Sequence, residues 1–258
     1  MKDEPCPIPL PGNLKTRLMG RKVLYYPSLP STMKVGREAA QQGAVEGTLV
    51  LAGQQTSGKG RLGRSWVSPP GNLSLSLVLR PTLRQLPRLT ILAALAVAHA
   101  IERVTGLEPR LKWPNDVLLR GKKVCGILVE SQTSGHSVAY AVVGVGLNVN
   151  LDPSAYPDIA EIATSLRAEA GRDVSPSQVL EAFLEETERL YLALQRGEPI
   201  HEEWRRRLET LGKEVRVTWG DEVEEGLAEG VDDDGNLLLR RPDGKLAVIA
   251  AGDVTLRS

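Results

Sequence analysis

This 258-residue sequence has only two cysteines and three histidines, and its formal net charge is zero. Cys6 and Cys125 lie too far apart in the sequence to form a redox or metal motif, and so few cysteines indicate a reducing, cytoplasmic setting. His99, His136 and His201 lack the spacing of metal ligands. We therefore expect surface or structural histidines and no metal held directly by side chains.

Acidic and basic residues balance at 32 each, and no strongly basic stripe runs along the chain. This balance argues against a protein that holds nucleic acid by its phosphates. The longest apolar run, Ile91 to Ala98, is far too short to cross a bilayer, and the first residues do not have the pattern of a signal peptide. We expect a soluble cytoplasmic protein whose partners include neither nucleic acid nor a membrane.

The apolar periodicity predicts an α+β fold, with hairpins in place of regular βαβ crossovers. Between Asn72 and Arg80, four leucines alternate with Ser74, Ser76 and Val78, which predicts a strand with only one face in the core. Further strands are predicted at residues 23–26, 47–53, 110–113, 117–119, 124–130 and 138–149, and helices at residues 31–42, 86–104, 176–196 and 200–211.

The pattern changes near Gly212, where short strands separated by acidic or glycine turns begin. We predict a large domain over residues 14–211 and a small β-barrel over residues 212–258. The barrel has a thin core, so we expect it to be stabilised by docking on the larger domain. Residues 1–13 are proline-rich and lack periodicity, which indicates a flexible lead-in.

The most informative stretch runs from Gln55 to Trp66 and joins a glycine-rich backbone to three cations and an indole. Glycines let consecutive N–H groups converge on an anion, and the cations add charge-assisted hydrogen bonds to carboxylate or phosphate oxygens. The indole offers a face on which a purine could stack. These features predict a nucleotide or acyl nucleotide as ligand. The glycines are Gly58, Gly60 and Gly63, and the cations are Lys59, Arg61 and Arg64.

Two common nucleotide-binding motifs do not explain this stretch. A Walker phosphate loop needs four residues between its first glycine and a Gly-Lys-Ser/Thr ending, which is absent. The three glycines match the spacing of the dinucleotide fingerprint, but Pro69-Pro70 forces extended backbone where that motif needs the start of a helix.

A second motif, Lys112-Trp113-Pro114-Asn115-Asp116, precedes a short strand, a basic turn and a further strand that begins near Lys123. The two strands read as the arms of a hairpin. We therefore expect the side chains of Asp116 and Lys123 to lie close together.

Together these motifs resemble those of the biotin protein ligases. The resemblance extends from about Val23 to the C-terminus and includes residues 55–66, residues 112–116, Lys123-Val124-Cys125-Gly126-Ile127-Leu128 and Gly144-Val145-Gly146-Leu147-Asn148-Val149-Asn150. It implies a catalytic domain similar to class II aminoacyl-tRNA synthetases, followed by an SH3-like barrel. It also implies two reactions: biotin and ATP, with Mg²⁺ bound through the phosphates, give biotinyl-5′-AMP and pyrophosphate, and biotin then passes to a lysine of a biotin carboxyl carrier protein.

The resemblance implies roles for individual residues. The expected catalytic residues are Lys123, which would bridge the biotin carboxylate and the α-phosphate, Arg61, and Asp116, which would orient or deprotonate the acceptor lysine. The expected biotin-binding residues are Ser31, Thr32 and Gln55 at the ureido head, with Met33, Gly58, Lys59, Gly60, Arg61, Lys123 and Gly126. The expected ATP- or adenylate-binding residues are Lys59, Arg61, Arg64, Lys112, Asn115 and Lys123, with Trp66 and Asn148 at the adenine.

Two positions depart from the family pattern: Met33 stands where Asn usually follows Ser-Thr, and Lys59 replaces the more common Arg. We expect both to alter affinity more than reaction type. Cys125 falls in a predicted buried strand, and core packing is favoured over a catalytic thiol there.

Alternative functions are a lipoate or octanoate protein ligase on a related scaffold and a biotin sensor without catalysis. The basic glycine stretch and the 112–116 motif favour the biotin-type enzyme over the first, and retention of Lys123 and Asp116 argues against the second. Barely twenty residues precede the first predicted strand, too few for a helix-turn-helix domain, so we expect a monofunctional ligase. A homodimer is possible.

Overall fold

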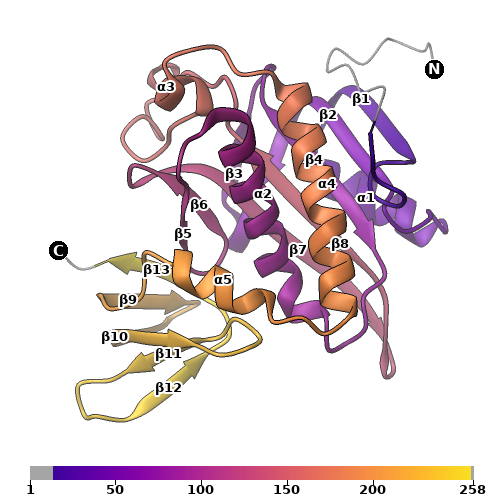
Figure 1. The fold of residues 1–258 in the computed structure, drawn as a ribbon. Coiled ribbons are helices and arrows are strands. Elements are labelled where there is room, and N and C mark those ends of the chain that lie inside the picture. The colour runs from indigo at the N-terminus through magenta and orange to yellow at the C-terminus, as the bar shows by residue number, and fades with distance from the viewer. Residues whose placement is uncertain (1–13, 257–258) are drawn as a thin grey trace.

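The computed structural model describes residues 14–256, and the predicted lead-in at residues 1–13 lies outside them. A mixed eight-stranded sheet forms the centre of the larger part (Figure 1). Its strands follow the order β1-β2-β4-β8-β7-β6-β5, with β3 paired to β2, and only β1 and β2 run parallel. The strands are β1 (Val23–Leu29), β2 (Leu49–Lys59), β3 (Ser65–Ser68), β4 (Leu73–Leu79), β5 (Arg110–Lys112), β6 (Asp116–Leu119), β7 (Lys122–Ser134) and β8 (Ser137–Leu147).

Hairpins dominate this sheet, as predicted, with one exception. Helix α1 (Thr32–Gln41) connects the parallel strands β1 and β2, and the three elements form a βαβ crossover. Ser31 precedes this helix in an extended conformation, but its side chain makes no capping hydrogen bond.

Helices cover both faces of the large sheet. Helices α2 (Leu89–Thr105) and α4 (Pro176–Gln195) lie side by side on one face, and α1 packs on the other (Figure 1). Helix α2 is apolar around much of its circumference because it packs against both the sheet and α4, and it ends at Gly106, which has a φ of 72°. Two shorter helices, α3 (Leu166–Ala170) and α5 (Ile200–Arg207), complete the layer, and α5 ends earlier than predicted.

Strand β4 is buried on both faces, so the prediction of a one-sided strand is wrong. Its leucines belong to the main core under α2 and α4. Val78 joins a smaller cluster with Met33 and Val142 under α1, and Ser76 packs beside Gly36 of that helix. The alternating serines therefore face a helix, and their hydroxyls are not in solvent.

The C-terminal part is a five-stranded antiparallel sheet with the order β12-β11-β10-β9-β13. Its strands are β9 (Glu214–Trp219), β10 (Glu222–Val231), β11 (Leu237–Arg240), β12 (Leu246–Ile249) and β13 (Asp253–Leu256). Strand β10 has four glutamates and two glycines, a composition typical of a turn. It nevertheless forms a strand that pairs with β9 and β11. Buried residues of this sheet belong to the same core cluster as the larger part.

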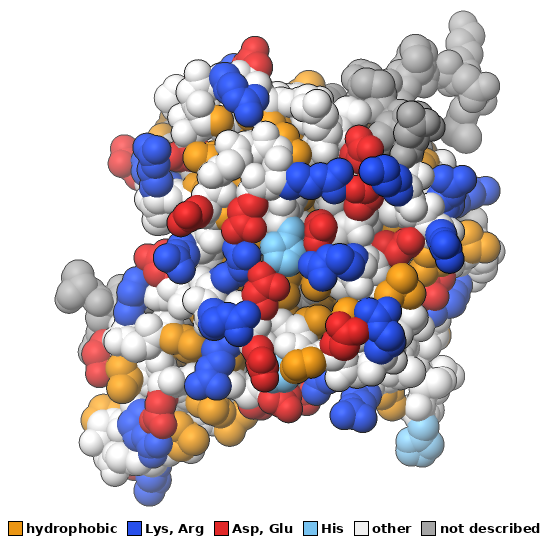
Figure 2. All heavy atoms as spheres, viewed as in Figure 1, with side chains coloured by type: hydrophobic (Ala, Val, Ile, Leu, Met, Phe, Trp, Pro, Cys, Tyr) orange, Lys and Arg blue, Asp and Glu red, His pale blue; other side chains and the backbone are white. Residues whose placement is uncertain are grey.

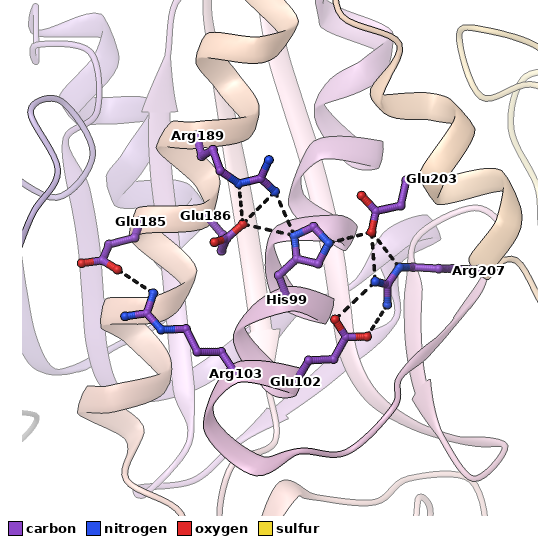
Figure 3. Close-up of polar contacts among 8 residues, drawn as sticks. All are labelled: His99, Glu102, Arg103, Glu185, Glu186, Arg189, Glu203 and Arg207. Carbon is purple, nitrogen blue, oxygen red and sulfur yellow. Dashed lines mark hydrogen bonds and ion pairs between the residues drawn. The ribbon is translucent and has the colours of Figure 1, made fainter.

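The face formed by α2, α4 and α5 presents intermixed acidic and basic side chains (Figure 2). His99 lies between Glu186, at 3.2 Å from its Nδ1, and Glu203, at 2.7 Å from its Nε2 (Figure 3). Arg207 completes the link to Glu203 and to Glu102, so this network joins three helices. His99 is accordingly a structural histidine.

None of the helices within residues 14–256 has the length and apolar character that crossing a membrane requires.

Candidate active site

A cavity of about 510 Å³ opens between the β2–β3 hairpin, strands β7 and β8, and the N-terminus of α1. It brings together residues that are more than 200 positions apart in the sequence, from Thr32 to Asp253. Fourteen of the predicted site residues line it, namely Thr32, Met33, Gln55, Lys59, Gly60, Arg61, Arg64, Trp66, Lys112, Asn115, Asp116, Lys123, Gly126 and Asn148.

Ser31 and Gly58 are the two predicted site residues that do not line the cavity. Ser31 is buried directly behind Thr32. At Gly58 a Cβ would collide with the backbone carbonyl of Trp66, its neighbour across the β2–β3 pairing. The glycine is therefore required by the approach of two strands, whereas the sequence predicted close approach to a ligand.

The basic glycine stretch forms a β-hairpin, which extends the predicted strand at residues 47–53. Strand β2 continues to Lys59, and β3 pairs back on it, with Lys59 opposite Ser65. The turn closes with a hydrogen bond from Gly60 N to Arg64 O at 2.7 Å, and Gly63 has a φ of 75°. Strand pairing fixes this backbone and carries the cations to the cavity wall.

A connected set of polar side chains lies behind Thr32. Gln55 Oε1 accepts from both Thr32 N at 2.8 Å and Thr32 Oγ1 at 3.1 Å. Gln55 Nε2 donates to Ser68 Oγ at 2.9 Å, and Ser68 lies 2.9 Å from Ser74 Oγ. Ser76 Oγ donates to Thr32 Oγ1 at 2.9 Å. These contacts hold two cavity-lining polar groups, Thr32 and Gln55, in fixed orientations.

Two glycines of β8 make room for two larger side chains. A Cβ at Gly144 would lie 2.5 Å from Met33 Sδ, and a Cβ at Gly146 would lie 2.5 Å from Trp66 Cε2. Glycine at these two positions lets the methionine and the indole lie against the sheet. All four residues line the cavity.

Asp116 and Lys123 form an ion pair, as the hairpin prediction required. Lys123 Nζ lies 2.6 Å from Asp116 Oδ1 and 5.4 Å from the centroid of the Trp66 ring. The backbone of Lys123 is held by the segment before α3, because its N–H donates to Ile162 O and its carbonyl accepts from Thr164 N, each at 2.9 Å. The ammonium group therefore projects into the cavity from a backbone paired on both sides.

The two arginines of the hairpin contact the C-terminal sheet. Arg61 donates to Asn115 Oδ1 at 3.1 Å and to Gly252 O at 3.3 Å, while Arg64 pairs with Asp253. Burial lowers the pKa of Arg61 below its usual range, opposed by the charges of Asp253 and Asp116. An arginine remains protonated near neutral pH after such a shift.

Asn148 and Cys125 lie at the buried side of the site. Asn148 is 3% exposed, and its Nδ2 donates to Thr164 O at 3.0 Å. Cys125 is fully buried, and burial raises the pKa of its thiol. A thiol without solvent access and with a raised pKa is a packing residue, as predicted.

Sequence reasoning missed the part of the wall formed by residues 159–163 and by two acidic side chains, Glu209 and Asp253. Asp253 reaches the cavity only because the C-terminal part docks beside it, and no local pattern signals that contact. Trp113, in contrast, belongs to the 112–116 motif but lies outside the cavity wall. Its indole N–H donates to Gly235 O at 2.8 Å, so this residue joins the two parts of the protein.

Within residues 14–256, no three His, Cys, Asp or Glu side chains lie together as a metal ion would require. Three of the four acidic groups of the cavity wall form ion pairs, Asp116 with Lys123, Asp253 with Arg64 and Glu209 with Lys213, and the fourth, Glu161, is exposed. A cation at this site would therefore depend on ligands that a bound anion brings.

Known proteins resemble the chain along most of its length. The profile of the biotin/lipoate A/B protein ligase family matches residues 25–148, and that of the biotin protein ligase C-terminal domain matches residues 210–257. The chain is 40% identical over 249 residues to the bifunctional ligase/repressor BirA of Bacillus subtilis, covering 94% of this chain and 76% of that protein. It is 39% identical over 215 residues to the biotin–[acetyl-CoA-carboxylase] ligase of Paracoccus denitrificans, covering 78% and 88%.

A similar solved structure is the biotin protein ligase from Aquifex aeolicus in complex with biotin and ATP. It has a TM-score of 0.75 and 29% sequence identity, and the match covers 92% of this chain and 99% of that one.

Proposed function

Because the chain belongs to the biotin protein ligase family, we propose that it joins biotin to a lysine of a biotin carboxyl carrier protein at the expense of ATP. One observation carries the proposal: a single cavity combines the fixed polar groups of Thr32 and Gln55 with five cationic side chains. The first suits a neutral polar head and the second suits a carboxylate and phosphates. The cations are Lys59, Arg61, Arg64, Lys112 and Lys123.

In the first step an oxygen of the biotin carboxylate attacks the α-phosphorus of ATP, the bond to the β-phosphate oxygen breaks, and pyrophosphate leaves. Two anions must approach each other, so positioning and electrostatic stabilisation dominate the barrier. Lys123 supplies a compact charge that can contact both oxygens, and Arg61 adds a second, partly buried one. Met33 and neighbouring apolar residues of the sheet supply the wall for the thioether ring.

Trp66 and Asn148 are proposed to hold the adenine. The indole packs against Gly146, and Asn148 is buried in the same wall. Mg²⁺, when bound, would offset negative charge on the phosphates. Since three of the four acidic side chains of the wall are paired with cations, Mg²⁺ would be held chiefly by phosphate oxygens.

In the second step the amine of the acceptor lysine attacks the carbonyl carbon of biotinyl-5′-AMP, an amide bond forms, and AMP leaves. A protonated amine is not nucleophilic, so a proton must be removed. Asp116 is the carboxylate in the cavity wall that adjoins Lys123, and we assign it to orient the acceptor ammonium and take that proton.

Biotin-dependent exchange of labelled pyrophosphate into ATP tests the first step, with lipoate and octanoate assayed in parallel. We expect exchange with biotin alone. Exchange with lipoate or octanoate alone would assign the protein to the lipoyl branch, and binding of biotin without exchange would make it a sensor.

A further inference from the structure

Ser74 and Ser76 are buried hydroxyls that touch neither the cavity nor solvent. They are 3% and 0% exposed, and neither lines the cavity. A buried hydroxyl is costly unless it is hydrogen-bonded, and apolar residues would pack as well under α1. The hydrogen bonds of these two serines therefore indicate their role in the structure.

Their hydrogen bonds end on the two polar groups of the cavity. Ser76 Oγ donates to Thr32 Oγ1 at 2.9 Å, and that hydroxyl donates to Gln55 Oε1 at 3.1 Å. On the other side of Gln55, its Nε2 donates to Ser68 Oγ, which lies 2.9 Å from Ser74 Oγ. The serines of β4 thus support Thr32 and Gln55 from behind.

A backbone N–H group fixes the direction of the hydrogen bonds between Thr32 and Gln55. Thr32 N–H can only donate, and it lies 2.8 Å from the Gln55 carboxamide, so the oxygen of that amide must face Thr32. Gln55 Oε1 then has both lone pairs occupied by Thr32, and Nε2 has given one of its two protons to Ser68. One N–H of Gln55 remains available to a ligand.

We propose that Ser76 and Ser74 are positioning residues: through Thr32 and Ser68 they hold the Thr32 hydroxyl and the Gln55 amide in the orientation that these two groups present to the polar head of the bound acid. This inference rests on the proposed function, in which that head is the cyclic urea of biotin. The two serines do not contact the reacting atoms, so their loss affects recognition of biotin more than chemistry.

Ser76→Ala tests the proposal, with KM for biotin and for ATP measured separately by pyrophosphate exchange. We expect KM for biotin to rise about tenfold, with KM for ATP and kcat changed less than about twofold. Thr48→Val is the matched control, because Thr48, directly before β2, also carries a buried hydroxyl but lies outside the cavity. It should lower Tm and leave both KM values unchanged.

A double-mutant cycle distinguishes positioning from general destabilisation. In a Thr32→Val background the hydroxyl through which Ser76 acts is missing, so Ser76→Ala should raise KM for biotin no further. Equal increases in both backgrounds, equal effects on biotin and ATP, or no effect would each overturn the proposal. If Ser76→Ala does not fold, Ser74→Ala carries the same test, with a smaller expected rise in KM for biotin. Absence of exchange in the unmodified protein would instead contradict the proposed function.

Discussion

Lys123 Nζ lies 2.6 Å from Asp116 Oδ1 across the paired strands β6 and β7. The pairing places the proposed phosphate-contacting cation of the first reaction beside the proposed base of the second. Because the two groups neutralise each other, binding of an anion to Lys123 would release Asp116 for the incoming acceptor ammonium. This order suits an enzyme that must form the adenylate before the lysine is activated.

Lys123→Ala should lower biotin-dependent pyrophosphate exchange by at least about 100-fold, since it removes a charge aimed at the developing phosphoryl transition state. Lys122→Ala is the matched control, because Lys122 is adjacent but exposed and outside the cavity wall. Exchange that survives in Lys123→Ala at the level of the control would remove Lys123 from the mechanism.

Asp116→Asn should separate the two reactions. Single-turnover transfer from preformed biotinyl-5′-AMP to a carrier domain should slow by about 100-fold, because general base catalysis contributes about that factor. Pyrophosphate exchange should fall by less than about tenfold, since the proposed first step does not use this carboxylate. Equal losses in both assays would show that Asp116 acts through Lys123 alone.

Gly144→Ala and Gly146→Ala form a matched pair on one strand. The first places a methyl group against Met33 and should raise KM for biotin, whereas the second places it against Trp66 and should raise KM for ATP. Each change should be about tenfold, because overpacking a fitted contact costs 1 to 3 kcal/mol. If the two variants raise the same KM, the assignment of Met33 to biotin and of Trp66 to adenine is wrong.

The His99 network predicts a pH dependence of stability. Burial acts to raise the pKa of Glu203, but the hydrogen bonds and charges of His99 and Arg207 outweigh it and hold that pKa below the ordinary 4.5. A carboxylate with a depressed folded-state pKa stabilises the fold above the unfolded-state value, and this contribution is lost as the pH falls through the folded-state pKa.

Glu203→Gln should therefore lower the free energy of unfolding by about 1 kcal/mol at pH 7, discounted for partial exposure, and by less below pH 4.5. Urea unfolding at both pH values measures this difference. Glu202→Gln, an exposed neighbour on the same helix, should show neither effect. A loss in Glu203→Gln that is independent of pH would contradict the role of its charge.

The α+β class, the all-β C-terminal part and most helices and strands could be predicted from the sequence, because each depends on local periodicity. Helix α2 and its cap at Gly106 are examples, as is the hairpin that joins Asp116 to Lys123. The burial of Ser76 could not be predicted, since the alternation of β4 is the same whether its second face meets water or α1.

The residues of the candidate site also fall into two groups, those that the local sequence predicts and those that only tertiary contacts bring to the site. The cations and glycines of the β2–β3 hairpin lie close together in the sequence, so their presence in one site could be predicted from the sequence. Asp253 and the supporting hydroxyls of Ser74 and Ser76 become part of the site only through tertiary contacts. Side chains that act through other side chains carry no sequence signal of their own.

Transfer of biotin to a carrier protein is the most direct test of the central claim. The protein would be incubated with biotin, ATP, Mg²⁺ and an unmodified biotin carboxyl carrier domain, and intact mass measured, with a carrier whose acceptor lysine is replaced by arginine as control. Our account predicts addition of one biotinyl group to the unmodified carrier only, dependent on ATP and lost in Lys123→Ala. An unmodified carrier after full incubation with active components, or equal labelling of the lysine-free control, would contradict it.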